Sequence, residues 1–297
     1  MYRAHFGLRE SPFGLTPDTS FAFSCNAHQE ALNTLVVATS SGEGFIKITG
    51  EVGTGKTLLC RRFLSTLDER CITAYIPNSS LDSRGLMVAL ADELRLRLEP
   101  RADQHQLLKQ LNHALLDFAR EGRRVVVCLD EAQAMPLETL EALRLLSNLE
   151  TEKRKLLQVV LFGQPELDDK LGHESVRQLR QRITFQSHLG TLTRRELELY
   201  VAHRLRIAGY TGHRLFTASA VAQLYRCSRG VPRLVNVIAN KALLLVYAEG
   251  EYEVRKRHVR LAAKDTPAAC RPGRWWWLRA AMPALAATTL GAWWWLT

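Results

Sequence analysis

The sequence has no pair of cysteines at the spacing that binds metals or supports redox chemistry. Its six cysteines stand apart along 297 residues, at Cys25, Cys60, Cys71, Cys128, Cys227 and Cys270. Zinc clips and thioredoxin-like motifs need a Cys-x-x-Cys spacing, so the sequence supports neither kind of site. Disulfide-stapled scaffolds are short secreted chains dense in cysteine, which excludes that class as well. We expect reduced, mostly buried thiols.

No secretory signal peptide is expected at the start of this sequence. The first ten residues mix charged and apolar side chains, whereas a signal peptide requires a hydrophobic run. Acidic residues are the minority charge, with 30 Asp and Glu against 40 Lys and Arg, a formal net charge of +10. This excess favours an anionic partner such as nucleic acid, phospholipid or nucleotide. The hydrophobic fraction of 46% and the charged fraction of 24% exclude a disordered or fibrous chain.

Tryptophan is absent from the first 274 residues, and all six copies lie in the triplets Trp275–Trp277 and Trp293–Trp295. The stretch from Ala280 to Leu296 carries no charged residue. Extended back to Trp275, it is long enough to span a bilayer, with Trp at both interfaces. Arginines precede the stretch and no charge follows it, so the positive-inside rule places the preceding chain in the cytoplasm. A buried or interfacial helix is the alternative, because Pro and Gly interrupt the stretch.

Apolar and amphipathic segments alternate through the first 190 residues. Short apolar runs predict strands at residues 45–49, 71–76, 125–129, 156–162 and 183–189. Helical periodicity predicts helices at residues 26–40, 58–67, 86–98, 105–119 and 137–149. This alternation predicts a parallel α/β sheet with helices on both faces. After Gly190 the pattern becomes helical, at residues 193–207, 218–225, 232–247 and 258–263.

A glycine-rich segment between the first predicted strand and the next helix matches the phosphate-loop pattern G-x-x-x-x-G-K-[ST] without departure. The backbone N–H groups of such a loop wrap phosphates, and the following helix N-terminus adds partial positive charge. Lys56 is expected to reach the β- and γ-phosphates, and the Thr57 hydroxyl to ligate Mg²⁺. The residues expected to bind nucleotide are Gly50, Glu51, Val52, Gly53, Thr54, Gly55, Lys56 and Thr57.

The predicted strand at residues 125–129 ends at Asp130 and Glu131. Ligands of open α/β sheets bind at the carboxyl ends of strands. Asp130 is expected to bind the nucleotide's Mg²⁺ through water. Glu131 is expected to be the general base that orients the attacking water. An acidic pair that only caps the next helix is the alternative, and the phosphate loop upstream disfavours it.

The phosphate loop and the Asp-Glu pair together resemble those of AAA+ ATPases, and the resemblance implies further catalytic residues. Gln164, after the predicted strand at 156–162, matches the polar sensor between the acidic residues and the γ-phosphate. Arg233, in Gly230-Val-Pro-Arg233, resembles the lid sensor that contacts the γ-phosphate. Arg180 and Arg182 stand where an arginine finger for a neighbouring subunit is expected. The sequence does not choose between these two, and plain turn or surface roles stay open for all four residues.

Longer segments narrow the resemblance. Four of them are similar to the ExeA/general secretion pathway A-type ATPases: Met1–Leu8, Leu129–Gln133, Gly163–Leu167 and Gly230–Asn236. Gly44–Gly50 and Thr73–Asn78 are most similar to the ATPases of mannose-sensitive haemagglutinin (MSHA) pilus biogenesis. The resemblance implies ATP and Mg²⁺ as cofactors and assembly into a homo-oligomer or hexamer-like ring. The periplasmic peptidoglycan-binding domain of secretion relatives is not expected in this chain.

Together these features predict a three-layer P-loop AAA+ core with a parallel sheet, a helical lid and a C-terminal transmembrane helix. The expected divisions are an N-terminal segment and helix (1–40), core (41–190), lid (191–265), linker (266–274) and anchor (275–297). The favoured function is ATP hydrolysis at a bacterial inner membrane, with the ATPase domain cytoplasmic, supporting an MSHA/type IV-like pilus or type II secretion-related system. Expected partners are assembly proteins of that system and the lipid bilayer. Nucleic acid is not expected. The alternatives are a nucleic-acid-associated ATPase of the transposition or replication-initiation type and a nucleotide switch with little turnover.

Overall fold

The computed structural model describes residues 2–97, 103–146 and 155–269. Contacts divide the chain into two compact units. The first, which we call the sheet unit, comprises residues 15–203 and 231–233. The second, the helical unit, comprises, among the described residues, 2–14, 204–230 and 234–269.

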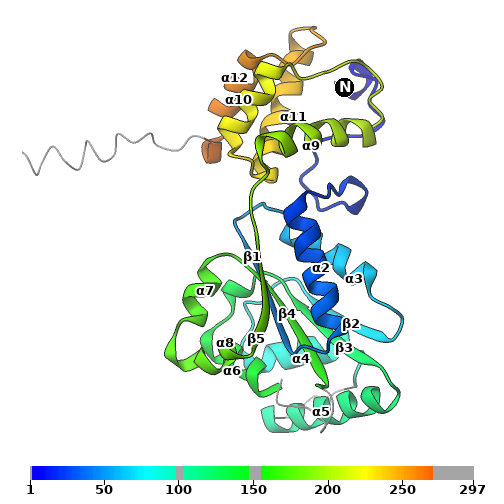
Figure 1. Cartoon of the computed structure of the whole chain (residues 1–297), viewed down its shortest axis with the longest axis vertical. Helices are drawn as coiled ribbons and strands as arrows, with labels where there is room; N and C mark the ends of the chain where they lie inside the picture. The colour runs from blue at the N-terminus through cyan, green and yellow to red at the C-terminus, as the bar shows by residue number, and fades with distance from the viewer. Residues whose placement is uncertain (1, 98–102, 147–154, 270–297) are drawn as a thin grey trace, which may run out of the picture. The chain divides into compact units, whose positions relative to one another are not determined.

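The sheet unit is built on five parallel strands in the order β2-β3-β4-β1-β5 (Figure 1). The strands are β1 (Phe45–Gly50), β2 (Cys71–Ile76), β3 (Arg124–Leu129), β4 (Leu157–Gly163) and β5 (Ile183–Leu189). The five predicted strands are therefore confirmed, and so is their parallel arrangement. Because β3, β4 and β1 are neighbours, their carboxyl ends meet at one edge of the sheet. The phosphate loop, Asp130 and Gln164 follow these three ends.

Helices cover both faces of this sheet, which confirms the predicted three-layer core. On one face, α2 (Asn26–Ser40) and α3 (Lys56–Thr66) bury apolar side chains against alternate residues of β1, β3 and β4. The other face is covered by α4 (Ser83–Glu93), α5 (Gln104–Arg120), α6 (Leu137–Leu146), α7 (Glu166–Leu171) and α8 (Arg177–Gln181). The sequence did not predict α7 and α8, because helices this short show no clear period. Three 3₁₀ turns complete the unit: η1 (Thr19–Phe21), η2 (Ala132–Ala134) and η3 (Glu174–Val176).

The helix predicted at residues 86–98 has the wrong bounds. It begins earlier, at Ser83, because the carboxylate of Asp82 caps it by accepting a 2.6 Å hydrogen bond from the Gly85 N–H. It ends earlier, at Glu93, and Arg95 has a φ of 56°, which a right-handed helix cannot contain. Residues 147–149 of the helix predicted at 137–149 lie outside the described residues.

The helical unit confirms the helical pattern predicted after Gly190. Its helices are α1 (Tyr2–His5), α10 (Ala218–Ser228), α11 (Pro232–Ala248) and α12 (Lys256–Lys264), followed by the 3₁₀ turn η4 (Pro267–Ala269). The helix α9 (Arg194–Ile207) has its first residues in the sheet unit and its last residues in the helical unit. The first residues of the chain fold into the helical unit. The Arg9 N–H donates to the carbonyl of Ala208 at 2.8 Å, and the rings of Phe13 and Phe216 lie 5.9 Å apart.

Within the part of the chain that the structure describes, no helix combines the length and the apolar character needed to cross a membrane. The expected linker from Cys270 onward and the expected anchor at 275–297 lie outside those residues. The other five cysteines are free thiols, in agreement with the expectation from their spacing.

Candidate active site

The glycine-rich loop from Gly50 to Thr57 joins β1 to α3 in the sheet unit. Gly53 has a φ of 81° and Gly55 a φ of 101°, a left-handed region that favours glycine. A Cβ atom at Gly53 would lie 2.5 Å from the Cβ of Arg233, and one at Gly55 would lie 2.9 Å from His28 Nε2. Both positions therefore require glycine. Successive residues of opposite hand form the kind of backbone concavity that binds anions.

Lys56 lies at the start of α3 and is only 5% exposed. Its Nζ donates to the carbonyls of Gly50 at 2.7 Å and Glu51 at 3.0 Å. Burial lowers the pKa of Lys56, while the carboxylates of Glu131 and Asp130 oppose that shift. The side chain is thus a buried cation positioned against the loop, where it can balance phosphate charge.

Asp130 is buried at the end of β3 and receives several hydrogen bonds. Its Oδ2 accepts from the Thr57 hydroxyl at 2.7 Å and from the Tyr75 hydroxyl at 3.3 Å, and its carbonyl accepts from Ser79 Oγ at 2.6 Å. Burial and the nearby Asp130 carboxylate raise the pKa of Tyr75, which keeps its hydroxyl a donor. Thr57 and Asp130 offer adjacent hard oxygen atoms, which are the ligands that Mg²⁺ prefers. The residues present therefore fit the expected metal.

Glu131 follows with a φ of 53°, a left-handed conformation that is uncommon outside glycine. Two side-chain amides hold one of its carboxylate oxygens: Oε2 accepts from Gln133 Nε2 at 2.5 Å and from Gln164 Nε2 at 3.0 Å. The Gln164 N–H also donates to Gln133 Oε1 at 3.0 Å. Among the described residues, none donates a hydrogen bond to the other oxygen, Oε1. The carboxylate is thus fixed on one side and available as a proton acceptor on the other.

The structure brings Arg233 to the loop through its backbone. Its N–H donates to the Gly53 carbonyl at 3.2 Å, while its side chain is exposed. The two expected finger residues lie elsewhere in the sheet unit. Arg180 lines a groove of about 480 Å³ together with Lys47 and Asp168. Arg182 donates from Nη1 to the Arg144 carbonyl at 3.5 Å.

Three residues of this site were missed by sequence reasoning. Tyr75 is the last but one residue of β2, and His28 lies in the first turn of α2. No motif marks either, because tertiary packing alone brings them to the site. Gln133 could have been noticed, because it stands two residues after Glu131 in a segment that the sequence already identified. The spacing alone, however, does not reveal that its side-chain amide contacts the Glu131 carboxylate.

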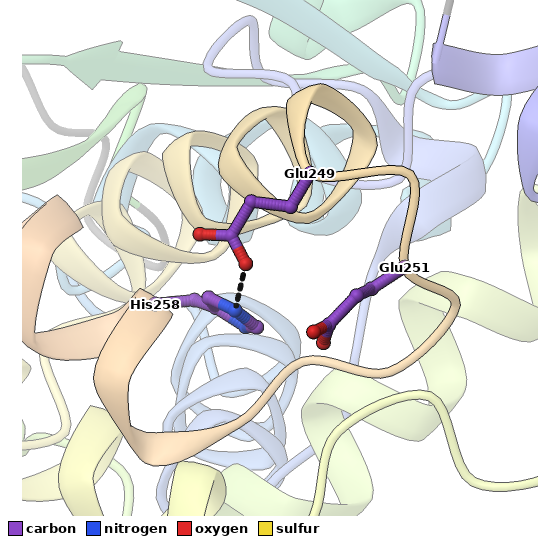
Figure 2. A group of neighbouring side chains, drawn as sticks. All are labelled: Glu249, Glu251 and His258. Carbon is purple, nitrogen blue, oxygen red and sulfur yellow. Dashed lines mark hydrogen bonds and ion pairs between the residues drawn. The ribbon is translucent and has the colours of Figure 1, made fainter.

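A second group of charged side chains, Glu249, Glu251 and His258, lies in the helical unit (Figure 2). Arg257 Nη2 already lies 2.5 Å from Glu249 and 2.7 Å from Glu251. His258 Nδ1 accepts a hydrogen bond from the Arg255 N–H at 3.0 Å, and its Nε2 lies 3.0 Å from Arg257 Nε and 3.1 Å from Glu249 Oε2. The Arg257 guanidinium contacts both carboxylates and the imidazole, and its positive charge balances the carboxylates. The group therefore acts as an ion-pair cluster that fastens the loop between α11 and α12.

Comparison with known proteins relates the chain to a protein family and to one curated relative. Residues 38–171 match the family described as AAA domain. A match to this family implies a P-loop, ATP binding and ATPase activity. The chain is homologous to General secretion pathway protein A of Aeromonas hydrophila, with 41% identity over 275 residues. The match covers 93% of this chain and 50% of the relative, so the chain spans about half of that protein's length.

Solved structures share the fold at low sequence identity. Cdc6p from Pyrobaculum aerophilum matches with a TM-score of 0.66 and 17% identity, covering 84% of this chain and 70% of its own. The ORC2 protein of Aeropyrum pernix matches with a TM-score of 0.61 and 18% identity, over 82% and 68%. RuvB of Thermotoga maritima matches with a TM-score of 0.56 and 16% identity, over 83% and 73%. The architecture is an α/β AAA+ core with a C-terminal helical lid.

Proposed function

We propose that this AAA-domain protein hydrolyses ATP at a bacterial inner membrane, in support of an MSHA/type IV-like pilus or a type II secretion-related system. The chemistry is supported above all by Glu131, because two amides fix one carboxylate oxygen and leave the other available to a water molecule. The biological setting is supported by the similarity to General secretion pathway protein A. The MSHA system is the finer proposal, drawn from the sequence segments that resemble its ATPases.

In the proposed hydrolysis reaction, different residues of the sheet unit bind the phosphates, hold the metal and accept the proton from water. Mg²⁺·ATP supplies the reacting phosphoryl group and the cation that neutralises its charge. The loop binds phosphate through its backbone, and Lys56 adds a fixed positive charge. Thr57 and Asp130 would hold the metal. Glu131 accepts a proton from water, while Gln133 and Gln164 prevent its carboxylate from rotating away, which preserves the alignment that catalysis needs.

The arginines extend this proposal to a homo-oligomer. Arg233 has its backbone on the loop and its side chain exposed, so we assign it the role of γ-phosphate sensor. Arg180 and Arg182 would act on the nucleotide of a neighbouring subunit, where a finger arginine contributes a large rate enhancement. A ring of subunits would then place one chain's Glu131 and another chain's arginine on the same phosphate.

The membrane setting is supported by charge and hydropathy. Residues 204–269 carry twelve Lys or Arg and only four Asp or Glu, and the uncharged stretch from Ala280 to Leu296 follows. Basic residues beside a membrane segment are attracted to anionic lipid. The same charge would suit DNA, which keeps the nucleic-acid ATPase as the second candidate. A salt-sensitive mobility shift of DNA by the full chain would favour that candidate.

The chemistry is tested by phosphate release from Mg²⁺·ATP, using the full chain in lipid nanodiscs over a range of protein concentrations. Glu131→Gln is expected to lower turnover by about 10²- to 10⁴-fold, as for loss of a general base, while ATP remains bound. The matched control is Glu138→Gln, an exposed glutamate at the start of α6. Bound ATP without turnover in the unmodified chain would favour the nucleotide-switch alternative, and unchanged turnover in Glu131→Gln would remove Glu131 from its role.

The setting is tested in cells of the source organism. We expect the full chain to sediment with inner membranes and a version ending at Thr266 to stay in the soluble fraction. Replacing the chromosomal gene with the Glu131→Gln form should reduce surface pili or secreted protein. Normal pili and normal secretion in that strain would contradict the proposed role while leaving the ATPase chemistry intact.

A further inference from the structure

We infer that His28 is a positioning residue of the nucleotide site, whose imidazole fixes the orientation of the Thr54–Gly55 peptide in the phosphate loop. The inference rests on the proposed ATP site and deepens it. His28 lies in the first turn of α2, and its Nε2 is 2.9 Å from the carbonyl oxygen of Thr54. The same nitrogen packs so closely against Gly55 that a Cβ there would lie 2.9 Å away.

The geometry of the peptide explains why this contact matters. A trans peptide is planar, so its C=O and N–H point in opposite directions. A donor that fixes the Thr54 carbonyl on one side therefore fixes the Gly55 N–H on the other side. Gly55, with a φ of 101°, has the widest conformational freedom of any residue. Without a hydrogen bond to the Thr54 carbonyl, that peptide could rotate and turn the Gly55 N–H away from the anion-binding concavity.

The proton arrangement follows from the partners of the imidazole. The Thr54 carbonyl can only accept, so the proton must sit on Nε2, and Nδ1 must then accept. Cys25 Sγ lies 2.6 Å from Nδ1 and supplies that donor as a thiol. Burial raises the pKa of Cys25, which favours the protonated thiol. Burial also lowers the pKa of His28, which favours a neutral imidazole with one N–H.

The first turn of α2 is itself held in place. Glu196, in the first turn of α9, accepts hydrogen bonds from the Thr193 N–H at 2.8 Å and from the Thr193 hydroxyl at 2.7 Å. Burial raises the pKa of Glu196, but these hydrogen bonds, the backbone of Asn26 and the nearby His28 lower it overall. The ring of Phe23 lies 5.7 Å from that of Tyr200. All of these residues belong to the sheet unit. Contacts around the start of α2 therefore fix the position of His28, which a residue that orients a binding site requires.

A purely space-filling role is the competing explanation, and matched substitutions separate the two. His28→Gln can still donate from a nitrogen close to the place of Nε2, whereas His28→Leu keeps an apolar volume and loses the donor. Cys25→Ser keeps a donor to Nδ1, whereas Cys25→Ala loses it. His113→Leu, at an exposed histidine of α5, is the control for histidine replacement away from the loop.

The experiment titrates ADP and ATP against the full chain by calorimetry and measures kcat and KM on the same samples. Loss of one neutral hydrogen bond predicts that His28→Leu weakens both nucleotides by about tenfold, because the loop binds the phosphates that they share. We expect kcat at saturating ATP to stay within about twofold. His28→Gln and Cys25→Ser should bind as the unmodified chain does, and Cys25→Ala should fall between.

Equal affinities for His28→Leu and the unmodified chain would overturn the inference. An equal loss in His28→Gln and His28→Leu would also overturn it, because a space-filling role would then suffice. If His28→Leu does not fold, the Cys25→Ala and Cys25→Ser pair decides in the same way. Failure of the unmodified chain to bind either nucleotide would overturn the proposed function and this inference together, whereas normal binding with insensitive variants overturns this inference alone.

Discussion

The hydroxyl of Thr57 donates a 2.7 Å hydrogen bond to Oδ2 of Asp130, so the end of the phosphate loop and the end of β3 meet at one pair of oxygen atoms. We expect Asp130→Asn to raise the Mg²⁺ concentration needed for half-maximal phosphate release by about tenfold or more, the usual cost of removing a group that supports a metal. Thr57→Ser keeps the hydroxyl and should behave as the unmodified chain. A Mg²⁺ titration at fixed ATP checks both, and identical titration curves for all three proteins would refute the metal assignment.

The second prediction concerns Lys56. Lys56→Ala should abolish measurable binding of ATP and ADP, because it removes the buried cation beside the loop carbonyls. Lys109→Ala, at an exposed lysine of α5, should bind normally. Calorimetric titration of both nucleotides is the measurement. Retained affinity in Lys56→Ala would contradict the assignment of the phosphate loop.

The third prediction tests the two amides on Glu131. Gln133→Ala and Gln164→Ala should each lower kcat by about three- to tenfold, the scale of one hydrogen bond, with KM unchanged. Either amide alone still limits rotation of the carboxylate, so the double variant should lose more than the product of the single effects. Steady-state kinetics of the three variants give the comparison. Strictly multiplicative effects would show that the amides do not hold the same group together.

The fourth prediction uses two glycines with similar backbone angles. Gly122 has a φ of 74° with open space around it, whereas Gly53 has a φ of 81° with Arg233 Cβ 2.5 Å from the added atom. Gly122→Ala should lower the unfolding free energy by about 1–2 kcal/mol, from left-handed strain alone. Gly53→Ala should lower it further, because a collision adds to the strain. Thermal unfolding measures both, and equal losses in Tm would show that Arg233 does not pack against the loop.

The fifth prediction is a pH dependence of stability that arises from His28. Burial lowers the pKa of His28 in the folded chain, so below the ordinary histidine value of about 6.5 the unfolded chain binds more protons. Stability should therefore fall as the pH is lowered through that value. The charged and titratable groups around the imidazole are Cys25, Arg62 and Glu196. His28→Gln removes the titration, so its Tm should fall less between pH 7.5 and 5.5, and parallel curves would contradict the prediction.

The phosphate loop and the acidic pair could be predicted because each lies within a short continuous segment next to an apolar strand. Lys56, Asp130 and Glu131 therefore needed only local patterns. The strand order could not be predicted from the same patterns, since hydrophobic runs mark which segments are buried but not which neighbour each strand pairs with. That order is what brings Gln164 to Glu131.

Residues that reach the site through packing gave no comparable signal. His28 looks like any polar residue in the first turn of a helix, and its role depends on where α2 lies against the loop. Tyr75 sits within a strand whose pattern reports only burial. The early end of α4 depends on a single left-handed residue, Arg95, which side-chain periodicity does not reveal. Sequence therefore located the reacting groups, and tertiary contacts determine what holds them.

The N-terminal residues belong to a compact unit whose remaining parts are encoded far downstream. Phe6, Leu8 and Phe13 are buried there, and Arg204 Nε donates to the carbonyl of Pro12. During synthesis these apolar side chains leave the ribosome about 190 residues before Arg204, a delay of roughly 10–40 s at bacterial rates of elongation. All five strands of the sheet unit are synthesised while these side chains are still unpaired. The nascent chain thus exposes an apolar N-terminal segment through most of its translation. We expect chaperones to bind this segment, and a purification tag placed there would interfere with its folding.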